Sequence, residues 1–369
     1  MVVTIETSSV LFSSALAISL IANIAFTTKF YYFRIGNSDK SKRIFQNKKG
    51  DVSGVQVAGD YHLHLEHVKE VAEEPYKEAI LELSKKSQAF ENEEENFLEV
   101  LGDYSFDGNG QINIKTGFIE LDDVIVELDK SELVSLLGFP GSGKTTFMLD
   151  IARFNAVKNN IPVIYFSLAS KSRKLIDRLI SAESRVDSSK IRSGKLSTDE
   201  EFMRIKDALD KLGNAPIFID DTTYVTVDEL VKKILTIKRS IKDGLIIIDG
   251  LDLLDGKDEN INLLKIKRAA SSVDLPIITT AQLPRGNVFS RGGRIRMSDL
   301  PETYTQIPDL VFVIERNYFY EDSPNIKAVS ILKNRNGSCL SSDLYFDEKH
   351  ITFLNIEKKE SKNISDEDW

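Results

Sequence analysis

The stretch GFPGSGKTT at Gly138–Thr146 determines how the rest of this 369-residue chain is interpreted. It matches the pattern G-x-x-x-x-G-K-[ST], with Lys144 and Thr145 at its last two positions. Glycines in such a loop let backbone N–H groups turn toward phosphate oxygens, and the positive end of the following helix dipole points the same way. We therefore expect this loop to bind a nucleoside triphosphate.

The residues of the loop have distinct expected roles. Lys144 is expected to contact the β- and γ-phosphates, and the Thr145 hydroxyl is expected to bind Mg²⁺. Because backbone N–H groups make most of the expected contacts with the phosphates, the whole stretch is predicted to contact the nucleotide. Its residues are Gly138, Phe139, Pro140, Gly141, Ser142, Gly143, Lys144, Thr145 and Thr146.

Three further segments end in polar side chains that suit the same site. Leu245–Ile248 is predicted to be a buried strand that leads to Asp249, whose carboxylate would hold Mg²⁺ through water. Ile219–Asp221 repeats this arrangement and is a second candidate for the metal, although a strand can also simply end in acidic residues. Gln282 ends another apolar run and is a candidate sensor of the γ-phosphate.

From about residue 104, strand-like apolar runs alternate with helical segments. This alternation predicts an α/β fold with a mostly parallel sheet that is covered on both faces. The predicted strands are Glu132–Leu137, Pro162–Ser167, Ala215–Ile219, Leu245–Ile248, Pro276–Thr280, Asp309–Ile314, Ala328–Lys333, Asp343–Phe346 and Ile351–Phe353. The predicted helices are Thr145–Val157, Lys171–Ala182, Asp199–Leu212, Val227–Arg239 (begun by a capping box at Thr226 and Glu229) and Asn260–Ser272.

Composition limits the classes of function. The formal net charge is −9 at pH 7, so any contact with nucleic acid needs a local basic patch. Cys339 is the single cysteine of the sequence, which excludes internal disulfides and a cysteine-based zinc site and fits a reducing compartment.

A local basic patch is present between residues 285 and 296, where arginines alternate with glycines around Phe289. Such a loop suits a nucleic-acid backbone, because arginine neutralises phosphate and an aromatic ring stacks on bases. A solvated loop or a subunit contact fits the same composition equally well. The candidate DNA-binding residues are Arg285, Arg291, Arg294 and Arg296.

The N-terminal region predicts a membrane anchor. Thr7–Thr28 carries no charge and is long enough to cross a bilayer as a helix. Aromatic and basic residues follow as far as Lys49, so the positive-inside rule places the downstream chain in the cytoplasm. A cleaved signal peptide and a soluble helix at a partner interface are the alternatives.

Four segments are predicted along the chain. They are a single-pass transmembrane anchor with a basic flank at 1–34, a linker with a short β element and a helix at 35–103, an α/β nucleotide-binding domain at 104–356 and an acidic disordered tail at 357–369. The linker contains His62, His64 and His67, for which solvent-facing positions are favoured over a metal site.

Nine ordered segments between Ile114 and Phe353 resemble the RecA-type motor domain of the DnaB-type replicative helicase family. They are TGFIELD at Thr116–Asp122, the phosphate loop, PVIYFSL at Pro162–Leu168, KIRSGKLS at Lys190–Ser197, APIFIDDT at Ala215–Thr222, LIIIDGLDLL at Leu245–Leu254, AQLPR at Ala281–Arg285, MSDL at Met297–Leu300 and KNRNG at Lys333–Gly337. The resemblance implies a RecA-like P-loop NTPase fold, ATP with Mg²⁺, a hexameric ring and single-stranded DNA as a partner. It also implies that Arg335, with Lys333, acts as a finger that reaches the γ-phosphate held by a neighbouring subunit.

The sequence departs from the family at functional positions. The family carries a glutamate, the general base, directly after the FSL segment, and this chain has Ala169 there. Loss of a general base typically costs about 10²–10⁴-fold in rate. Asp220, Asp252 (in place of a glutamine) and Glu302 are the carboxylates that can replace it, and Pro301 stands in place of an arginine.

Two functions from different classes are consistent with these features. The first is a membrane-anchored ring ATPase of the DNA-helicase type, with hydrolysis slowed by the change at Ala169. The second is a nucleotide-gated ring scaffold, used in plasmid, phage or defence functions, that binds ATP and DNA without unwinding. Lys144, Asp249, Gln282, Lys333 and Arg335 are the candidate catalytic residues of the first.

Overall fold

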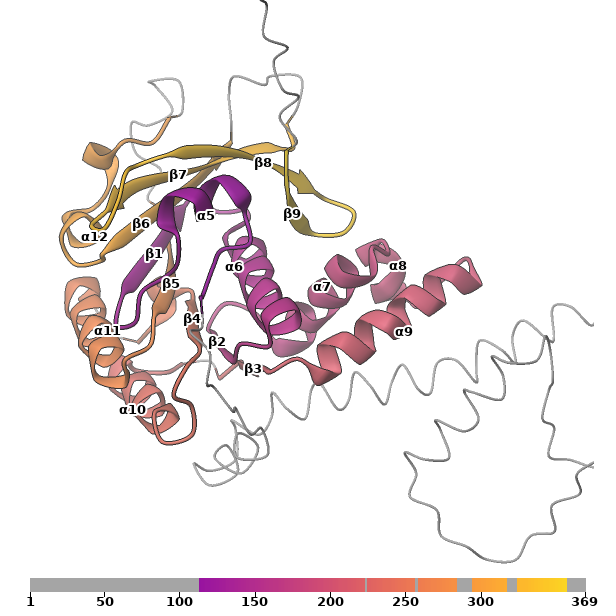
Figure 1. Cartoon of the computed structure of the whole chain (residues 1–369), viewed down its shortest axis with the longest axis horizontal. Coiled ribbons are helices and arrows are strands. Elements are labelled where there is room, and N and C mark those ends of the chain that lie inside the picture. The colour runs from indigo at the N-terminus through magenta and orange to yellow at the C-terminus, as the bar shows by residue number, and fades with distance from the viewer. Residues whose placement is uncertain (1–112, 223, 256–257, 284–293, 317–323, 357–369) are drawn as a thin grey trace, which may run out of the picture. The chain divides into compact units, whose positions relative to one another are not determined.

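A parallel sheet carries the phosphate loop at the carboxyl end of one of its inner strands (Figure 1). The computed structural model describes residues 113–222, 224–255, 258–283, 294–316 and 324–356. Within these ranges nine strands form one sheet in the order β3-β2-β4-β5-β1-β6-β7-β8-β9. The strands are β1 Leu133–Gly138, β2 Val163–Ser167, β3 Ile217–Asp220, β4 Leu245–Asp249, β5 Ile277–Gln282, β6 Leu310–Arg316, β7 Ile326–Asn334, β8 Ser341–Asp347 and β9 Thr352–Asn355.

The first six strands run parallel and the last three extend the sheet in antiparallel fashion. All residues of β1 and of β4 are buried, as expected for strands that have helices on both faces. The run Leu245–Ile248 is therefore continuous in apolar character rather than alternating. The predicted mostly parallel α/β sheet is confirmed, and each of the nine predicted strands is present within two residues of its predicted ends.

Helices cover both faces of the sheet, and each face has its own apolar core. One core contains Leu121, Phe147, Leu175 and Ile205, from helices on one face. The other contains Leu230, Leu263 and Tyr304. The helices are α5 Ile119–Ile125, α6 Lys144–Arg153, a π-helical turn η1 Phe154–Lys158, α7 Ser172–Ser184, α8 Ser188–Ser193, α9 Asp199–Asn214, α10 Val227–Ile237, a 3₁₀ turn η2 Leu251–Leu253, α11 Glu259–Val273, a second 3₁₀ turn η4 Met297–Asp299 and α12 Glu302–Gln306.

The helix that follows the phosphate loop is buried on all sides over most of its length. Every residue from Thr146 to Ala152 in α6 is buried. The reason is that β9 packs on the side that would otherwise face water, where Asp150 accepts hydrogen bonds from the Thr352 hydroxyl (2.7 Å) and the Phe353 N–H (2.7 Å). The C-terminal strand therefore fixes the helix whose N-terminus faces the phosphates.

Local signals explain several helix ends. The predicted capping box at Thr226 and Glu229 is present at the start of α10. The predicted helix Thr145–Val157 divides into α6 and the π-helical turn η1. The short helices α5, α8 and α12 are absent from the prediction, because five to seven residues give too little periodicity to detect.

Several predictions fall outside the described residues. These are the anchor and its basic flank at 1–34, the linker with its three histidines at 35–103, the tail at 357–369, and Arg285 and Arg291. Among the residues that the structure describes, no helix has the length and apolar character needed to cross a bilayer.

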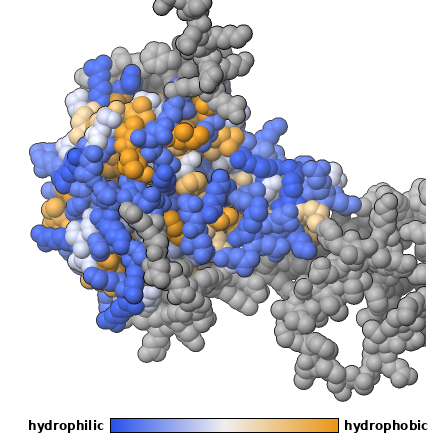
Figure 2. All heavy atoms as spheres, in the orientation of Figure 1, coloured by the Kyte–Doolittle hydropathy of each residue, from blue (hydrophilic) through white to orange (hydrophobic). Residues whose placement is uncertain are grey.

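The surface in Figure 2 is mostly hydrophilic where the described residues are visible, and apolar residues gather in patches between the polar ones. The large apolar side chains with the highest exposure on α5 and its end are Ile119 (64%) and Val126 (63%). The described part of the chain thus has the surface of a folded domain with local apolar contacts.

Candidate nucleotide-binding site

The phosphate loop has a backbone that favours glycine. Gly141 and Gly143 have φ angles of +74° and +105°, in the left-handed region. A Cβ on Gly143 would also lie 2.9 Å from the Phe353 ring, and a Cβ on Gly138 would lie 2.7 Å from the Ser142 hydroxyl oxygen. Side chains at these positions would therefore displace the loop from the end of β1.

Two polar groups of the loop fit a phosphate ligand. The Ser142 Oγ atom is buried and has no hydrogen-bond partner among the described residues. The Lys144 Nζ atom donates to two carbonyl oxygens of its own loop, those of Gly138 (2.8 Å) and Phe139 (3.1 Å). Burial lowers the pKa of Lys144, and the charges of Asp252 and then Asp249 oppose this shift. A triphosphate would supply the anionic partner that this buried ammonium group lacks.

Asp249 is held rigidly at the carboxyl end of β4. Its carboxylate accepts hydrogen bonds from the Tyr165 hydroxyl (2.9 Å) and the Thr280 hydroxyl (2.6 Å). Burial raises the pKa of Tyr165, and the Asp249 charge raises it further, so the phenol stays a neutral donor. These contacts orient a carboxylate on the same sheet edge as Thr145, and such a pair of oxygen ligands fits Mg²⁺.

Gln282 lies directly beside the loop, because β5 and β1 pair in parallel with Gln282 opposite Gly138. The N–H of the next residue, Leu283, donates to the Gly138 carbonyl (3.1 Å). The Gln282 side chain is exposed at the end of β5. The structure therefore brings this predicted sensor to the phosphate loop.

Asp220 is placed differently from the prediction that it supports the same metal. It ends β3, the outermost strand on that side, and β2 separates β3 from β4. Its carboxylate pairs with Lys233 (2.6 Å) and also accepts a hydrogen bond from Thr222. This pairing gives Asp220 a structural role at the edge of the sheet, away from Asp249.

The predicted finger residues both contact the carboxyl end of α12. The Lys333 Nζ atom donates to the carbonyls of Thr305 (2.8 Å) and Gln306 (3.0 Å), and Arg335 donates to the Gln306 carbonyl (3.3 Å). Arg335 also pairs with Asp309 at 2.7 Å. Burial lowers the pKa of Lys333, and the neighbouring Arg335 charge adds to this effect.

Asp309 connects this region to the central strand. Its carboxylate accepts a hydrogen bond from the Leu133 N–H (2.9 Å) and pairs with Lys267 as well as with Arg335. Leu133 begins β1, whereas the phosphate loop follows its last residue, Gly138. At about 3.3 Å per residue, the two ends of β1 are about 17 Å apart. Arg335 and the phosphate loop of one chain therefore lie at opposite ends of the same strand.

Two of the four predicted DNA-contacting arginines are described, and both Arg294 and Arg296 are exposed. The charge of Arg294 partly offsets the raised pKa that burial gives Glu315, which places this arginine near the end of β6. Since Ile314 in β6 pairs with Gly138, this is the edge of the sheet that carries the phosphate loop.

Tyr165 and Asp309 are site residues that sequence reasoning missed. The sequence predicts only that each lies in a strand or at its beginning, because each adjoins an apolar run. A polar side chain within or directly before a buried apolar run is the sequence signal that could identify such residues, since a buried polar group needs a partner. The identity of the partner depends on the register of the sheet.

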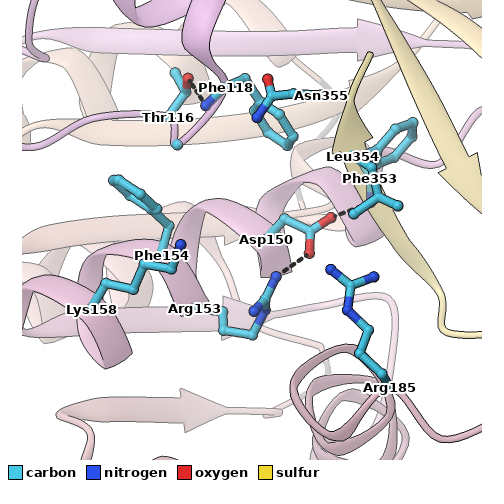
Figure 3. Close-up of a pocket in the computed structure, with 11 residues that line it drawn as sticks. Thr116, Phe118, Asp150, Arg153, Phe154, Lys158, Arg185, Phe353, Leu354 and Asn355 are labelled. Carbon is cyan, nitrogen blue, oxygen red and sulfur yellow. Dashed lines mark hydrogen bonds and ion pairs between the residues drawn. The ribbon is translucent and has the colours of Figure 1, made fainter. Parts of the chain in front are cut away.

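A separate polar cavity of about 190 Å³ lies beside α6 and β9 (Figure 3). In the close-up, Asp150 lies at its centre between Arg153 and Phe353, and Arg185 approaches from the other side. Arg153 is paired with Glu183 (2.8 Å) as well as with Asp150. Polar side chains that line the cavity connect β9 to α6. The Phe353 ring lies between the cavity and Gly143.

The chain is similar to known proteins of one family. The family model described as the DnaB-like helicase C-terminal domain matches residues 113–355. The replicative DNA helicase DnaB of Geobacillus stearothermophilus is 31% identical over 299 residues, which cover 76% of this chain and 66% of the relative. The replicative DNA helicase DnaC of Bacillus subtilis (strain 168) is 29% identical over 322 residues, which cover 82% of this chain and 70% of the relative.

A solved structure of an ATPase domain superimposes with a TM-score of 0.61 at 25% identity, and the match covers 72% of this chain and 99% of that chain. The chain spans between 40% and 70% of the length of three curated relatives that it matches.

Glu132 generates a prediction about pH. Burial is the main cause that raises its pKa from 4.5 to about 7, and repulsion from Asp129 and Asp309 adds to it. The folded state thus binds this proton more tightly than the unfolded state, and the associated stability is lost as pH rises from about 4.5 to 7. We expect the free energy of unfolding to fall by about 1 kcal/mol over this range, after allowance for the partly exposed position.

Replacement of Glu132 by glutamine should remove this fall, because an amide does not titrate in this range. The amide oxygen can still accept from Asn336, which donates to Glu132 at 2.7 Å. Urea unfolding between pH 5 and 8 measures the effect. Glu200→Gln, at an exposed position, is the matched control and should keep the wild-type dependence. Identical slopes for Glu132→Gln and wild type would show that this carboxyl group titrates normally.

Proposed function

The chain belongs to the DnaB-like helicase C-terminal domain family, and on this basis we propose that it is an ATP-hydrolysing ring motor that acts on single-stranded DNA. One observation carries the proposal. The phosphate loop and the Lys333–Arg335 pair lie at opposite ends of β1, so one chain holds both halves of a hydrolytic site without joining them. Two copies of the chain in head-to-tail contact can join them.

Head-to-tail contacts close into rings when the rotation between copies is right. In the proposed ring, which we take to be a hexamer, the phosphate loop of one copy faces Lys333 and Arg335 of the next. An arginine supplied in this way stabilises charge that develops on the γ-phosphate, an effect worth about 10³–10⁵ in rate. In the isolated chain Arg335 is already positioned by Asp309 and by the end of α12.

Within the copy that binds ATP, the chain's own groups have separate tasks. Lys144 exchanges its loop carbonyls for the β- and γ-phosphates, and Gln282 senses the γ-phosphate from the neighbouring strand. Thr145 and Asp249 would hold Mg²⁺, which when bound neutralises phosphate charge. Tyr165 and Thr280 keep the Asp249 carboxylate oriented.

A second candidate function is a ring scaffold that binds ATP and DNA but turns ATP over very slowly. The alanine at position 169, directly after the segment that ends in Leu168, favours it, because an alanine cannot accept a proton from water. Retention of Lys333 and Arg335 favours the motor, since a scaffold has no chemical use for groups that stabilise a transition state.

We also propose that the N-terminal segment attaches this motor to a membrane with the ATPase domain in the cytoplasm. Support comes from the sequence, in which 22 uncharged residues at Thr7–Thr28 precede a basic and aromatic flank.

The shared site predicts complementation between two inactive variants. Lys144→Ala should abolish ATP binding in its own loop, and Arg335→Ala should abolish hydrolysis at the neighbouring loop. A mixture of the two contains contacts between neighbouring subunits (seams) that combine an intact loop from one variant with an intact arginine from the other. With random mixing, about a quarter of the seams are complete and should restore that share of the ATPase rate.

Steady-state ATP hydrolysis by the separate and mixed proteins measures this recovery. A mixture of Lys144→Ala with Lys144→Ala/Arg335→Ala is the control and should stay inactive. Absence of any recovery in a mixture that still assembles would place the complete site within one chain.

The basic patch predicts a salt-dependent effect. Arg294 and Arg296 are exposed at the edge that carries the phosphate loop. Replacement of both by alanine should lower the slope of log affinity against log salt for single-stranded DNA by about 1.4, since each lost phosphate contact removes about 0.7. Fluorescence anisotropy with an oligothymidine measures the slope. The matched control is Arg239→Ala/Lys242→Ala, two exposed basic residues between α10 and β4, at the other end of the parallel strands. An unchanged slope in the first variant would locate the DNA contact elsewhere.

The membrane proposal predicts that the full chain stays in the pellet when bacterial membranes are washed with alkaline carbonate. Ile18→Lys combined with Ile21→Lys should release it, because each lysine near the centre of a membrane helix costs about 2.5–3.5 kcal/mol. Ile18→Leu combined with Ile21→Leu is the control and should stay in the pellet. Release of the wild-type chain would contradict the anchor.

A further inference from the structure

The turn that follows β4 places a carboxylate at the edge of the sheet that carries the phosphate loop. Gly250 adopts a φ of +107°, and the chain then forms the 3₁₀ turn η2, closed by a hydrogen bond from the Leu253 N–H to the Gly250 carbonyl (2.9 Å). Leu251 is buried and anchors this turn. Asp252, the next residue, is therefore exposed at the edge of the sheet where Asp249 and the phosphate loop lie.

Four other carboxylates near the carboxyl ends of the strands already have partners. Asp249 accepts from two hydroxyl groups, and Asp220 pairs with Lys233. Asp221 accepts from the Ser172 N–H (2.7 Å), and Glu315 accepts from the Ile295 N–H (2.7 Å). Within the described ranges, Asp252 makes no hydrogen bond or ion pair, so its carboxylate is available to a ligand.

Asp252 also lies in the electrostatic neighbourhood of the phosphate-binding lysine. Of the two carboxylates that oppose the lowered pKa of Lys144, Asp252 acts more strongly than Asp249. The turn passes close to position 169, because a Cβ on Gly250 would lie 3.6 Å from the Ala169 Cβ. The turn that carries Asp252 thus passes beside Ala169, which has no carboxylate, and the Asp252 charge acts on Lys144.

We propose that Asp252 is the carboxylate that orients the attacking water and accepts its proton during ATP hydrolysis. This inference rests on the proposed ATPase function. In the step, the water oxygen forms a bond to the γ-phosphorus, and the bond from that phosphorus to the bridging oxygen breaks. The electron pair of the broken bond stays on the terminal phosphate of ADP, and the proton from water passes to Asp252. Glu302, the other carboxylate named from the sequence, is hydrogen-bonded to Gln306 on α12.

The test is Asp252→Asn in the full chain, which keeps the size of the side chain and removes its basicity. The steady-state turnover number should fall by about 10²–10⁴-fold, the usual contribution of a general base. Affinity for a non-hydrolysable ATP analogue and the oligomeric state should stay within about twofold of wild type, because binding groups are unchanged. Asp255→Asn, at an exposed carboxylate three residues further on, is the matched control and should keep wild-type turnover.

A second variant separates a catalytic role from a structural one. Ala169→Glu in the Asp252→Asn background supplies a carboxylate from the other side of Gly250 and should raise turnover at least about tenfold. Failure of this rescue, or loss of analogue binding in Asp252→Asn itself, would assign Asp252 a structural role and overturn the inference. Turnover in Asp252→Asn within about threefold of wild type would also overturn it.

The same measurements distinguish this inference from the proposed function. A wild-type chain that binds the analogue but does not turn ATP over would overturn the role of Asp252 and leave the scaffold. A wild-type chain that does not bind the analogue would overturn the proposed function.

Discussion

Asp309 holds Arg335 in a fixed position relative to the beginning of β1, and the proposed chemistry depends on that position. Its carboxylate accepts from the Leu133 N–H and pairs with Arg335 and Lys267. The backbone repeats the connection, because the Asp309 N–H donates to the Leu133 carbonyl and the Arg335 N–H donates to the Asp309 carbonyl. A buried carboxylate with this many donors is held in one orientation. The arginine is consequently presented at one end of β1 while the phosphate loop is fixed at the other.

The second constraint is the helix that starts at the phosphate loop. A helix N-terminus binds phosphate only if its axis keeps a constant direction, and α6 is buried on the side where an exposed helix would meet water. Asp150 bonds β9 to the middle of α6, and the Phe353 ring occupies the space beside Gly143. Burial raises the pKa of Asp150 while these donors lower it. The antiparallel extension of the sheet therefore contributes directly to the position of the phosphate loop.

Sequence reasoning recovered what is local and missed what depends on register. Leu245–Asp249 is an uninterrupted aliphatic run that ends in a carboxylate, so both the buried strand and its polar end can be recognised from the sequence alone. The loop at Gly138–Thr146 needs specific residue types within nine positions and is equally visible. Asp309 is different, because its partners Leu133, Lys267 and Arg335 are far apart in the sequence. The choice between the two interpretations of Asp220 also depends on strand order: Asp220 matches Asp249 locally, but the order of the strands puts it at the outer edge beside Lys233.

Ala169 and Asp252 both depart from the family pattern, and the structure shows how the two positions are related. Along the sequence, Ala169 and Asp252 are unrelated changes, one at the end of β2 and one after β4. In the sheet these strands are neighbours, with Ser167 opposite Asp249, so the two turns that follow them emerge side by side. General-base catalysis requires a carboxylate within hydrogen-bond distance of the attacking water rather than on a particular strand, so the base that we propose can come from the β4 turn instead of the β2 turn. The positive φ angle of Gly250 lets the chain turn sharply after β4. The alanine at position 169 and the exposed Asp252 thus stand at two adjacent strand ends, which is why we propose that the second compensates for the first.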